Sequence, residues 1–342
     1  MNDPQHISGE LSETLESLRR AIENNPREPP PESKQDDATP LAPVIQLPLW
    51  PEHRRAAPNA LFRSALFPAL NFQQGRGFVK NQTIASVGGV TVLFTGERFD
   101  QSDLDVYLEL LNLARIHPLG TECSFSAHGM LKLVGRQTGK SDHRWLHAVL
   151  TRLSGGVVDI SDHKKRYFGT LIGGGLKDEI SKHYCIRINP EFATLFGYGM
   201  WSSIDREQRR ALHRSVTAKA LHAYYATHAT PGPHRYDTLA ALVGLSNPNK
   251  RQQRATLIKA HDILANEEIG FLSHYERQLD TITVYLNPTP SQARHIARRA
   301  VTKCGRSRSP RRARDSVDAC GPSKALPPTT RESVDTQSHR RP

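Results

Sequence analysis

The chain lacks the features that mark membrane-spanning, disulfide-rich and zinc-binding proteins. No run of 18 or more apolar residues occurs, and the start of the chain shows no basic segment followed by an apolar one. The 4 cysteines include no Cys-x-x-Cys pair, so they indicate neither a disulfide framework nor a structural zinc site. We therefore expect a soluble cytoplasmic protein without a membrane partner, long enough at 342 residues for two ordinary domains.

The chain also lacks a recognisable active site. No Ser–His–Asp set or carboxylate pair stands out, so a nuclease or relaxase would have no metal or catalytic cluster to use. The segment from Gly135 to Ser141 resembles a phosphate-binding loop, but Val134 occupies the position of its first glycine. His222, His228 and His234 have no cysteine or acid pair to complete a metal site. We expect no enzymatic activity and no cofactor.

Charge is distributed unevenly along the chain. Residues 1–43 carry 4 Lys/Arg against 9 Asp/Glu, whereas residues 288–342 carry 13 against 4. The net charge of +12 therefore leaves the middle, 44–287, at about +8. A basic globular region suggests binding to a polyanion, because neutralised phosphates release condensed counterions. A generic basic domain would have the same charge.

Composition divides the chain into five segments. The first contains an apolar stripe from Ile7 to Ile22 at helical spacing, followed by a linker rich in Pro, Glu and Asp. Basic residues with Ser and Pro, which favour disorder, follow Pro288. The predicted division is an acidic tail (1–43), a linker with a peptide motif (44–80), two domains (81–200 and 201–287) and a disordered basic tail (288–342).

The two central segments show the same succession of predicted elements. The first has a hairpin over 83–94, a helix over 101–116 capped by Asp100, a short helix over 127–134, a helix from Asp142 to Leu153, and three strands up to 188. The second has a long helix over 205–225, a short helix over 238–243, a helix over 250–264 and two strands. Helix, helix–turn–helix and β-hairpin is the order of a winged helix. We therefore predict an α+β fold with two tandem winged-helix domains.

The helix over 142–153 predicts a surface for DNA. Its apolar residues share one face, and the opposite face carries basic and short polar side chains. An arginine on such a face can donate two parallel hydrogen bonds to guanine when the helix enters the major groove. A solvated helix face is the alternative interpretation. The predicted contacts are Lys140, Arg144, His147 and Thr151.

The corresponding helix of the second domain and a hairpin of the first carry further basic residues. On the helix, four positive charges stand against one acid, Asp262. The hairpin tip could follow an adjacent groove, although charged turns are usually only solvated. These predicted DNA contacts are Lys250, Arg251, Arg254 and Lys259 on the helix, and Lys164, Lys165 and Arg166 at the hairpin.

Residues 44–67 form an apolar stretch between the acidic tail and the regular pattern. Its first part contains Gln46, Leu47, Leu49 and Trp50, residue types that suit a short peptide bound in a partner's pocket. The same residues could instead lie on the folded domain. The spacing alone does not distinguish these alternatives.

This stretch carries a resemblance to known families. The sequence from Gln46 to Trp50 resembles the Gln-Leu-x-Leu-aromatic peptide by which replication proteins bind the sliding clamp, with the unusual residues Pro48 and Trp50. Arg54, Pro58, Asn59 and residues 63–67 resemble the opening of the DNA-binding part of TrfA-type plasmid replication initiators. The similarity extends, more weakly, through 91–96, the helix–turn–helix up to Leu153, and 244–264.

The resemblance implies a protein that binds directly repeated sites (iterons) of a plasmid origin through tandem winged helices. It further implies double-stranded DNA, the sliding clamp, the host replicative helicase and the host initiator as partners, and a possible self-dimer. A transcriptional repressor with the same two domains is the alternative function. The peptide from Gln46 to Trp50 favours the initiator, because a repressor has no use for it.

Overall fold

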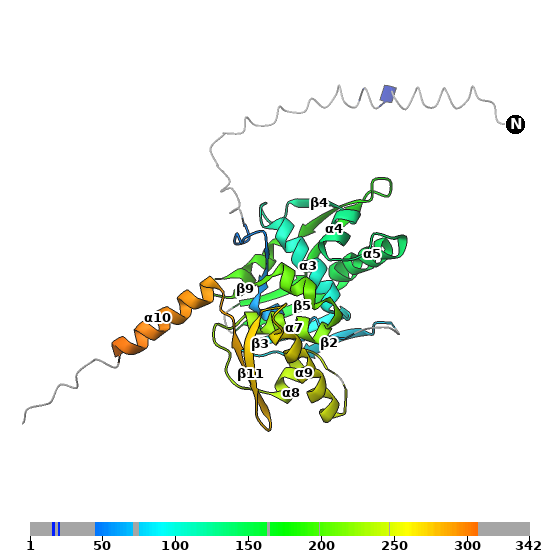
Figure 1. Ribbon diagram of the computed structural model, residues 1–342. Helices are drawn as coiled ribbons and strands as arrows, with labels where there is room; N and C mark the ends of the chain where they lie inside the picture. Colours follow the sequence, from blue (N-terminus) through cyan, green and yellow to red (C-terminus); the bar gives the residue numbers. More distant parts are fainter. Residues whose placement is uncertain are drawn as a thin grey trace, which may run out of the picture. The chain divides into compact units, whose positions relative to one another are not determined.

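The computed structural model describes residues 16, 17, 20, 45–70, 75–162, 165–197, 199–245 and 247–306. The chain forms two units, one ending at Asn287 and one beginning at Pro288. The apolar residues of the predicted stripe from Ile7 to Ile22, the linker 26–43 and the tail beyond 306 lie outside the described residues. Helices and strands mix throughout the first unit, so the predicted α+β class is confirmed (Figure 1).

The first unit contains the following elements up to residue 205. They are β1 (Arg54–Pro58), α2 (Asn59–Phe62), β2 (Phe78–Ile84), β3 (Val90–Glu97), α3 (Gln101–Ala114), β4 (Glu122–Ser126), α4 (Ala127–Leu133), α5 (Lys140–Gly155), β5 (Val157–Asp162), β6 (Lys165–Thr170), β7 (Ile172–Lys177), β8 (His183–Ile188), the 3₁₀ helix η1 (Pro190–Phe196) and β9 (Trp201–Asp205).

The remaining elements follow β9. They are α6 (Arg206–Ala211), the 3₁₀ helix η2 (Leu212–Arg214), α7 (Val216–Ala226), β10 (His234–Arg235), α8 (Tyr236–Leu242), α9 (Lys250–Ala265), β11 (Leu272–Arg277), β12 (Thr281–Leu286) and, in the second unit, α10 (Pro290–Arg306).

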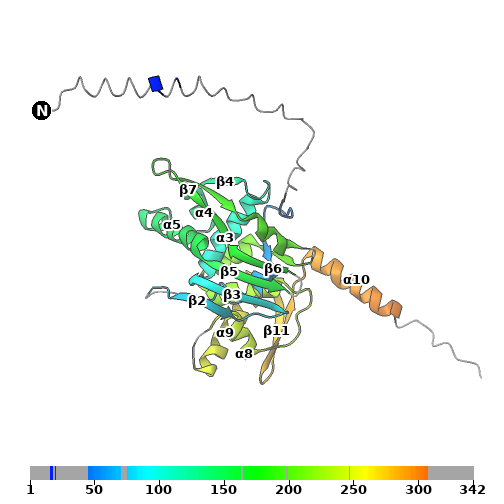
Figure 2. The same ribbon diagram turned by 180° about the vertical axis from the view of Figure 1, so that it is seen from behind.

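The strands of the first unit form four antiparallel sheets. Two have three strands each, in the orders β4-β8-β7 and β10-β12-β11. In each of them, the strand that comes first in the sequence pairs with the strand that comes last in the sequence. A four-stranded sheet has the order β2-β3-β5-β6, and β1 pairs with β9. Figure 2, the view from behind, shows β2, β3, β5 and β6 side by side.

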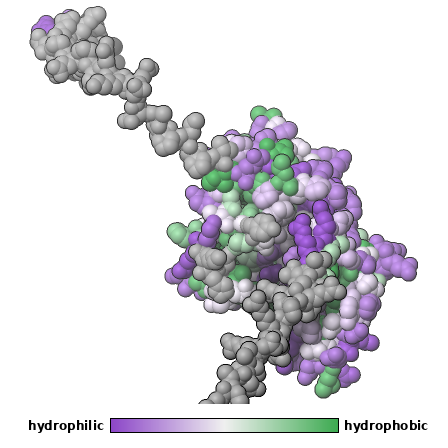
Figure 3. Space-filling model, turned by 90° about the vertical axis from the view of Figure 1, so that its left-hand side faces the viewer, coloured by the Kyte–Doolittle hydropathy of each residue, from purple (hydrophilic) through white to green (hydrophobic). Residues whose placement is uncertain are grey.

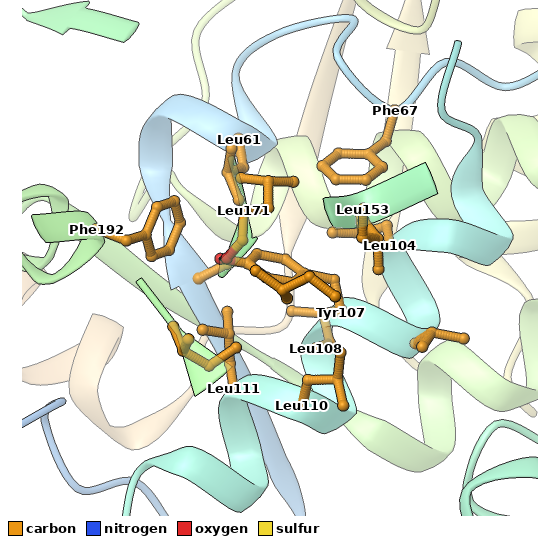
Figure 4. Close-up of a cluster of buried hydrophobic side chains, with 14 of the residues drawn as sticks. Leu61, Phe67, Leu104, Tyr107, Leu108, Leu110, Leu111, Leu153, Leu171 and Phe192 are labelled. Carbon is orange, nitrogen blue, oxygen red and sulfur yellow. The ribbon is translucent and has the colours of Figure 1, made fainter. Parts of the chain in front are cut away.

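Helix α3 lies at the centre of the larger hydrophobic cluster. Nearly every residue of α3 is buried. The surface in Figure 3, by contrast, is mainly hydrophilic with small apolar patches. The N-terminus of α3 is held by a capping box, in which the Asp100 side chain accepts from the amides of Ser102 and Asp103. Figure 4 shows Tyr107 among leucines, and its hydroxyl donates to the Leu171 carbonyl at 3.4 Å.

The carboxylate of Asp103 joins α3 to α5. Arg152 donates to both of its oxygens, from Nη2 at 2.8 Å and from Nε at 3.2 Å. Arg76 donates to the same carboxylate at 2.9 Å. Asp103 is inaccessible to solvent, so both arginines replace the water it lost on folding. The pairing fixes α5 against α3.

Residues 45–70 are not the linker that the sequence predicts. Residues 54–58 form β1 and pair with β9, and Arg63 donates to Thr227 from Nε and Nη2 at 2.9 and 2.8 Å. Ala69 donates to the Val243 carbonyl at 2.7 Å. The apolar residues of this segment are buried because they complete the two hydrophobic clusters of the unit. They include Leu47, Trp50, Ala56, Ala57, Leu61, Phe62, Leu66, Phe67 and Ala69.

Two other sequence predictions are wrong. The helix expected over 205–225 is broken into α6, η2 and α7, because the Ser215 side chain accepts from the amide of Ala218 and starts a new helix. The disorder expected beyond Pro288 does not hold for α10, where Pro290 begins a segment rich in Ala and Arg, both good helix formers.

The smaller hydrophobic cluster draws all but one of its buried members from residues 212–284. It encloses His222 and His261, both inaccessible to solvent. His222 Nε2 donates to Gln208 Oε1 at 3.4 Å. His261 Nδ1 donates to the Leu257 carbonyl at 2.7 Å, and its Nε2 accepts from the Tyr225 hydroxyl at 2.8 Å. Burial lowers the pKa of His222 to about 3 and that of His261 to about 4.

These histidines predict a loss of stability in mild acid. Both folded pKa values lie below 6.5, so the unfolded state binds protons first and the free energy of unfolding falls as pH decreases from about 6.5 towards 4. Two such groups contribute up to about 2.7 kcal/mol per pH unit. Urea unfolding at pH 7, 6 and 5 should show a shallower pH dependence in His222→Gln/His261→Gln. The exposed His213→Gln serves as control, and an unchanged slope in the double variant would contradict the prediction.

Arg152 predicts a second stability effect. Arg152→Met retains much of the side-chain volume but leaves the Asp103 carboxylate short of a partner, which should lower the free energy of unfolding by about 3 kcal/mol. Arg144→Met on the same helix removes an exposed charge and should change it by less than about 0.5 kcal/mol. Denaturant midpoints of the two variants provide the measurement. Equal midpoints would show that Arg152 does not anchor α5.

Candidate nucleic-acid interface

The first part of the candidate interface is the pair α4 and α5. Ser126 caps α4, its side chain accepting from the amide of Gly129 at 3.0 Å, as the sequence predicts. Helix α5 begins at Lys140 after Gly139, two residues before the predicted cap, Asp142. Asp142 instead lies in the first turn, where it pairs with Arg136 at 3.1 Å. A carboxylate there also interacts favourably with the helix dipole.

The polar face of α5 is exposed. Lys140, Arg144, His147 and Thr151 are all exposed, while Leu146 and its apolar neighbours face the core. Neither Lys140 nor Arg144 has a hydrogen-bond or ion-pair partner among the described residues. Thr151 donates to the carbonyl of His147 at 3.0 Å, which leaves its hydroxyl oxygen able to accept. The arrangement presents two cations and two small polar groups in one row.

A hairpin flanks this exposed face. The Tyr184 hydroxyl of β8 lies 3.4 Å from His147 Nδ1, and Lys177 of β7 lies 6.0 Å from the centroid of the Tyr184 ring. Between α5 and β7–β8 lies a groove of about 120 Å³, lined among others by Thr151 and Leu176. The hairpin next to α5 is therefore β7–β8.

The predicted basic hairpin belongs to a different sheet from the hairpin β7–β8. The hairpin of β5 and β6, whose tip the sequence predicts to follow an adjacent groove of DNA, belongs to the four-stranded sheet with β2 and β3. Lys164 lies outside the described residues, and Lys165 is exposed at the start of β6. Arg166 pairs with Asp159 of β5 at 2.5 Å, which lowers the pKa of that carboxyl. The missed signal was β4 (Glu122–Ser126), whose pairing with β8 defines the other sheet.

The second part of the candidate interface is the pair α8 and α9. Asn249 caps α9, its side chain accepting from the amide of Gln252 at 3.2 Å. Gly244, in the turn before it, has a φ of 71°, and a Cβ there would lie 2.4 Å from Pro68. The turn between α8 and α9 therefore requires glycine for both its conformation and its close approach to the 45–70 segment.

The four predicted cations of α9 differ in their surroundings. Arg251 and Lys259 are exposed and have no hydrogen-bond or ion-pair partner among the described residues. Lys250 pairs with Asp237 of α8 at 2.8 Å, which lowers the pKa of that carboxyl. Arg254 stacks over the Tyr236 ring at 4.4 Å. Arg254 also donates to the Gln278 carbonyl at 3.0 Å, so its guanidinium is held in place.

The first unit has two halves, residues 45–200 and residues 201–287; α5 lies in the first half and α9 in the second half. Figures 1 and 2 place α5 in the upper part and α9 in the lower part of the unit. Each follows a short helix and precedes the last two strands of a three-stranded sheet. Each helix thus exposes cationic side chains at the corresponding place of its own series of elements.

A buried charged junction joins the two halves. Asp105 of α3 pairs with Arg209 at 2.6 Å and with Lys219 at 2.5 Å. Glu109 of α3 pairs with Arg55 at 2.8 Å. Burial lowers the pKa of Lys219, an effect that the Asp105 charge opposes. These residues line a cavity of about 420 Å³, and sequence patterns do not reveal them because their partners are far apart in the chain.

Two of the four predicted clamp-binding residues are buried. Trp50 stacks with Phe196 at 6.2 Å between centroids, and its Nε1 donates to Asn112 Oδ1 at 3.0 Å. Leu47 is buried as well. Gln46 donates to the Arg115 carbonyl at 3.2 Å, and Leu49 is 70% exposed. The segment thus lies on the folded domain, the second of the two alternatives that its spacing left open.

The described residues show neither a metal-binding cluster nor a membrane span. No group of three or more His, Cys, Asp or Glu side chains among them is arranged to hold a metal ion. No described helix combines the length and the apolar character needed to cross a bilayer.

Comparison with known proteins identifies relatives. A family model described as TrfA protein matches residues 33–275. The plasmid replication initiator protein TrfA of Escherichia coli is 23% identical over 236 residues, which cover 66% of this chain and 60% of that relative.

Two solved structures resemble the fold at low sequence identity. Domains 2 and 3 of RctB match with a TM-score of 0.47 and 11% identity, covering 68% of this chain and 99% of that one. The Pi initiator protein in complex with iteron DNA matches with a TM-score of 0.39 and 12% identity, covering 59% of this chain and 100% of that one. Because the family model spans more than half of the sequence, the chain belongs to the TrfA family.

Proposed function

We propose that this chain is a plasmid replication initiator that binds direct repeats of an origin through two winged-helix domains, residues 81–200 and 201–287. The protein acts by binding and deforming DNA in the cytoplasm and catalyses no reaction. The relative from Escherichia coli bears the name of a plasmid replication initiator, which supports this assignment.

One observation carries the proposal. The series α3, β4, α4, α5, β7, β8 and the series α7, β10, α8, α9, β11, β12 have the same strand pairing, and the same element order apart from β5 and β6, which lie between α5 and β7 and belong to the four-stranded sheet. In each, the helix before the last two strands exposes cationic side chains. A helix in this position of a winged helix enters the major groove, and its first turns meet base edges. Two such helices suit two successive major-groove segments of one repeat.

The exposed side chains have different expected tasks. Arg144 and Arg251 have no other partner among the described residues and can each donate two hydrogen bonds to the O6 and N7 of guanine. Lys140 and Lys259 suit phosphates, which give affinity without sequence preference. The exposed pair of Lys250 with Asp237 contributes little to stability, so a phosphate can replace Asp237 as the partner of Lys250.

Origin opening follows from deformation of the DNA. Several copies on adjacent repeats bend the duplex, and the cost of bending favours melting of a neighbouring A·T-rich segment. The opened segment then receives the host helicase and the host initiator. A self-dimer, in which one copy covers the DNA-binding face of another, would keep the protein inactive.

The sliding clamp is the proposed partner of residues 46–50. Because Leu47 and Trp50 are buried in the fold, clamp binding requires this segment to leave the surface of α3. The affinity of the intact chain is then the affinity of the free segment multiplied by the fraction of molecules in which the segment is released. A peptide of residues 44–52 should bind the clamp more tightly than the intact chain.

The assignment of the two helices predicts the behaviour of Arg144→Ala/Arg251→Ala. A repeat selected by the protein from random duplexes serves as probe. Each substitution removes a base contact worth about 1–3 kcal/mol, so the double variant should lose specific binding and keep weak, salt-sensitive binding. Footprinting and titration at two salt concentrations provide the measurement.

The matched control for this experiment is Arg210→Ala/Arg214→Ala, which removes the same charge from exposed positions outside α5, α9 and both hairpins. This control should footprint the repeat normally. A normal footprint from Arg144→Ala/Arg251→Ala would show that the helices are wrongly assigned.

The clamp assignment predicts the behaviour of Leu49→Asp. Leu49 is exposed in the fold, so the substitution should leave stability and repeat binding unchanged while reducing clamp affinity at least tenfold, by roughly 1.4 kcal/mol or more. Ile45→Asp, just outside the motif, is the control. Surface-immobilised clamp provides the readout, and equal binding by both variants would exclude residues 46–50 as the docking peptide.

A further inference from the structure

The two hairpins beside α5 and α9 each expose one aliphatic side chain at the tip. Ile180, between β7 and β8, is 95% exposed, and Leu279, between β11 and β12, is 81% exposed. They are the two most exposed large hydrophobic residues of the described chain. Since the two series of elements correspond, these residues occupy equivalent positions in the two halves.

Local hydrogen bonds hold both tips in defined turns. The Asp178 carboxylate accepts from the amides of Ile180 at 2.8 Å and Ser181 at 3.2 Å. At the other tip, the Gln278 amide donates to the Thr281 carbonyl at 2.9 Å, and the Thr281 hydroxyl donates to Gln278 Oε1 at 3.0 Å. Each aliphatic side chain is thus presented on a turn fixed by its neighbours.

The charges around each tip nearly cancel. Glu179 pairs with Lys177 at 2.7 Å and with Lys182 at 3.0 Å, and both lysines hold the pKa of Glu179 at about 2. At the second tip, Arg277 and Asp280 are opposite in sign. A tip that followed phosphates would carry an excess of positive charge. What distinguishes these tips is the aliphatic group.

Each hairpin also contacts the helix that we assign to the major groove. Arg254 of α9 donates to the carbonyl of Gln278, the residue before Leu279. On the other side, Tyr184 of β8 lies within 3.4 Å of His147 on α5. When either helix enters the major groove, its hairpin therefore lies beside the adjacent part of the duplex.

The separation of the two residues favours DNA over a protein partner. A protein interface needs a contiguous area of about 600 Å² or more on each side. Single aliphatic side chains on separate hairpin tips do not form such an area. A single aliphatic side chain does suffice as a wedge between two base pairs, which it partly unstacks to kink the duplex.

We propose that Ile180 and Leu279 act as wedges that enter the minor groove beside each recognition helix and kink the repeat. This inference rests on the proposed function and adds a source for the deformation. Easily unstacked pyrimidine–purine steps at the two positions would favour insertion. Each bound chain would then introduce two kinks.

The test compares binding with bending in the full-length protein. The duplex is the repeat selected by the wild-type protein from random sequences, with fluorophores at its ends to report bending. Ile180→Ser/Leu279→Ser should keep the dissociation constant within about tenfold, because phosphate and major-groove contacts remain, while the bend at saturation falls by about half or more. Ile180→Met/Leu279→Met, which keeps an apolar wedge, should restore the bend.

Two controls separate the possible failures. Ile116→Ser/Phe168→Ser removes two exposed apolar side chains elsewhere and should bend the duplex as the wild type does. If the wild type selects and binds no repeat, the proposed function fails and the wedges fail with it. If the wild type binds and bends the repeat, and the Ser/Ser variant bends it equally, only the wedge proposal is overturned.

Discussion

Three carboxylates on α3 attach α5, the second half of the first unit and β1 to this helix. Asp103 binds Arg152 of α5, Asp105 binds Arg209 and Lys219 of the second half, and Glu109 binds Arg55 of β1. Buried ion pairs add little net stability, but an arrangement that separated them would leave unpaired charges in the core. The pairs therefore specify one arrangement of the halves around α3 more than they stabilise it.

This constraint bears on the proposed recognition of DNA. Two helices read one repeat only if their separation matches the spacing of the grooves, and a flexible connection would cost entropy at every binding event. Here α5 is fixed to α3 by Arg152, and the second half is fixed to α3 by Arg209 and Lys219. The segment 45–70 adds a further connection, through the pairing of β1 with β9 and through Arg63. These connections hold α5 and α9 in one fixed arrangement, as the proposed reading of one repeat requires.

The local features of the fold were predictable from the sequence. Caps at Asp100 and Ser126, the apolar face of α5 and the exposed positions of Lys140 and Arg144 all follow from residues within a few turns of each other. The long-range features were not. The pairing of β4 with β8 and of β1 with β9 joins residues far apart in sequence, and sequence patterns do not show that β7–β8, in a different sheet from β5–β6, is the hairpin beside α5.

Residues 45–70 are a second case in which the sequence does not reveal a long-range contact. Their apolar side chains suggested a peptide for a partner, because no regular element of their own could bury them. In the fold, Phe196 and Trp201 from a distant part of the chain cover Trp50. Sequence spacing does not reveal such a distant partner. Packing of the segment on the fold and binding of the segment to the clamp are compatible if the segment can detach. The clamp-binding role stays a prediction.

Missing-contact footprinting with the two single variants, Arg144→Ala and Arg251→Ala, tests the central claim most directly. The account predicts that each variant loses protection at a different guanine, with the two positions about one helical turn, or roughly 10 base pairs, apart on one face of the same duplex. Loss at the same position in both variants, or no loss in one of them, would contradict the reading of one repeat by two helices.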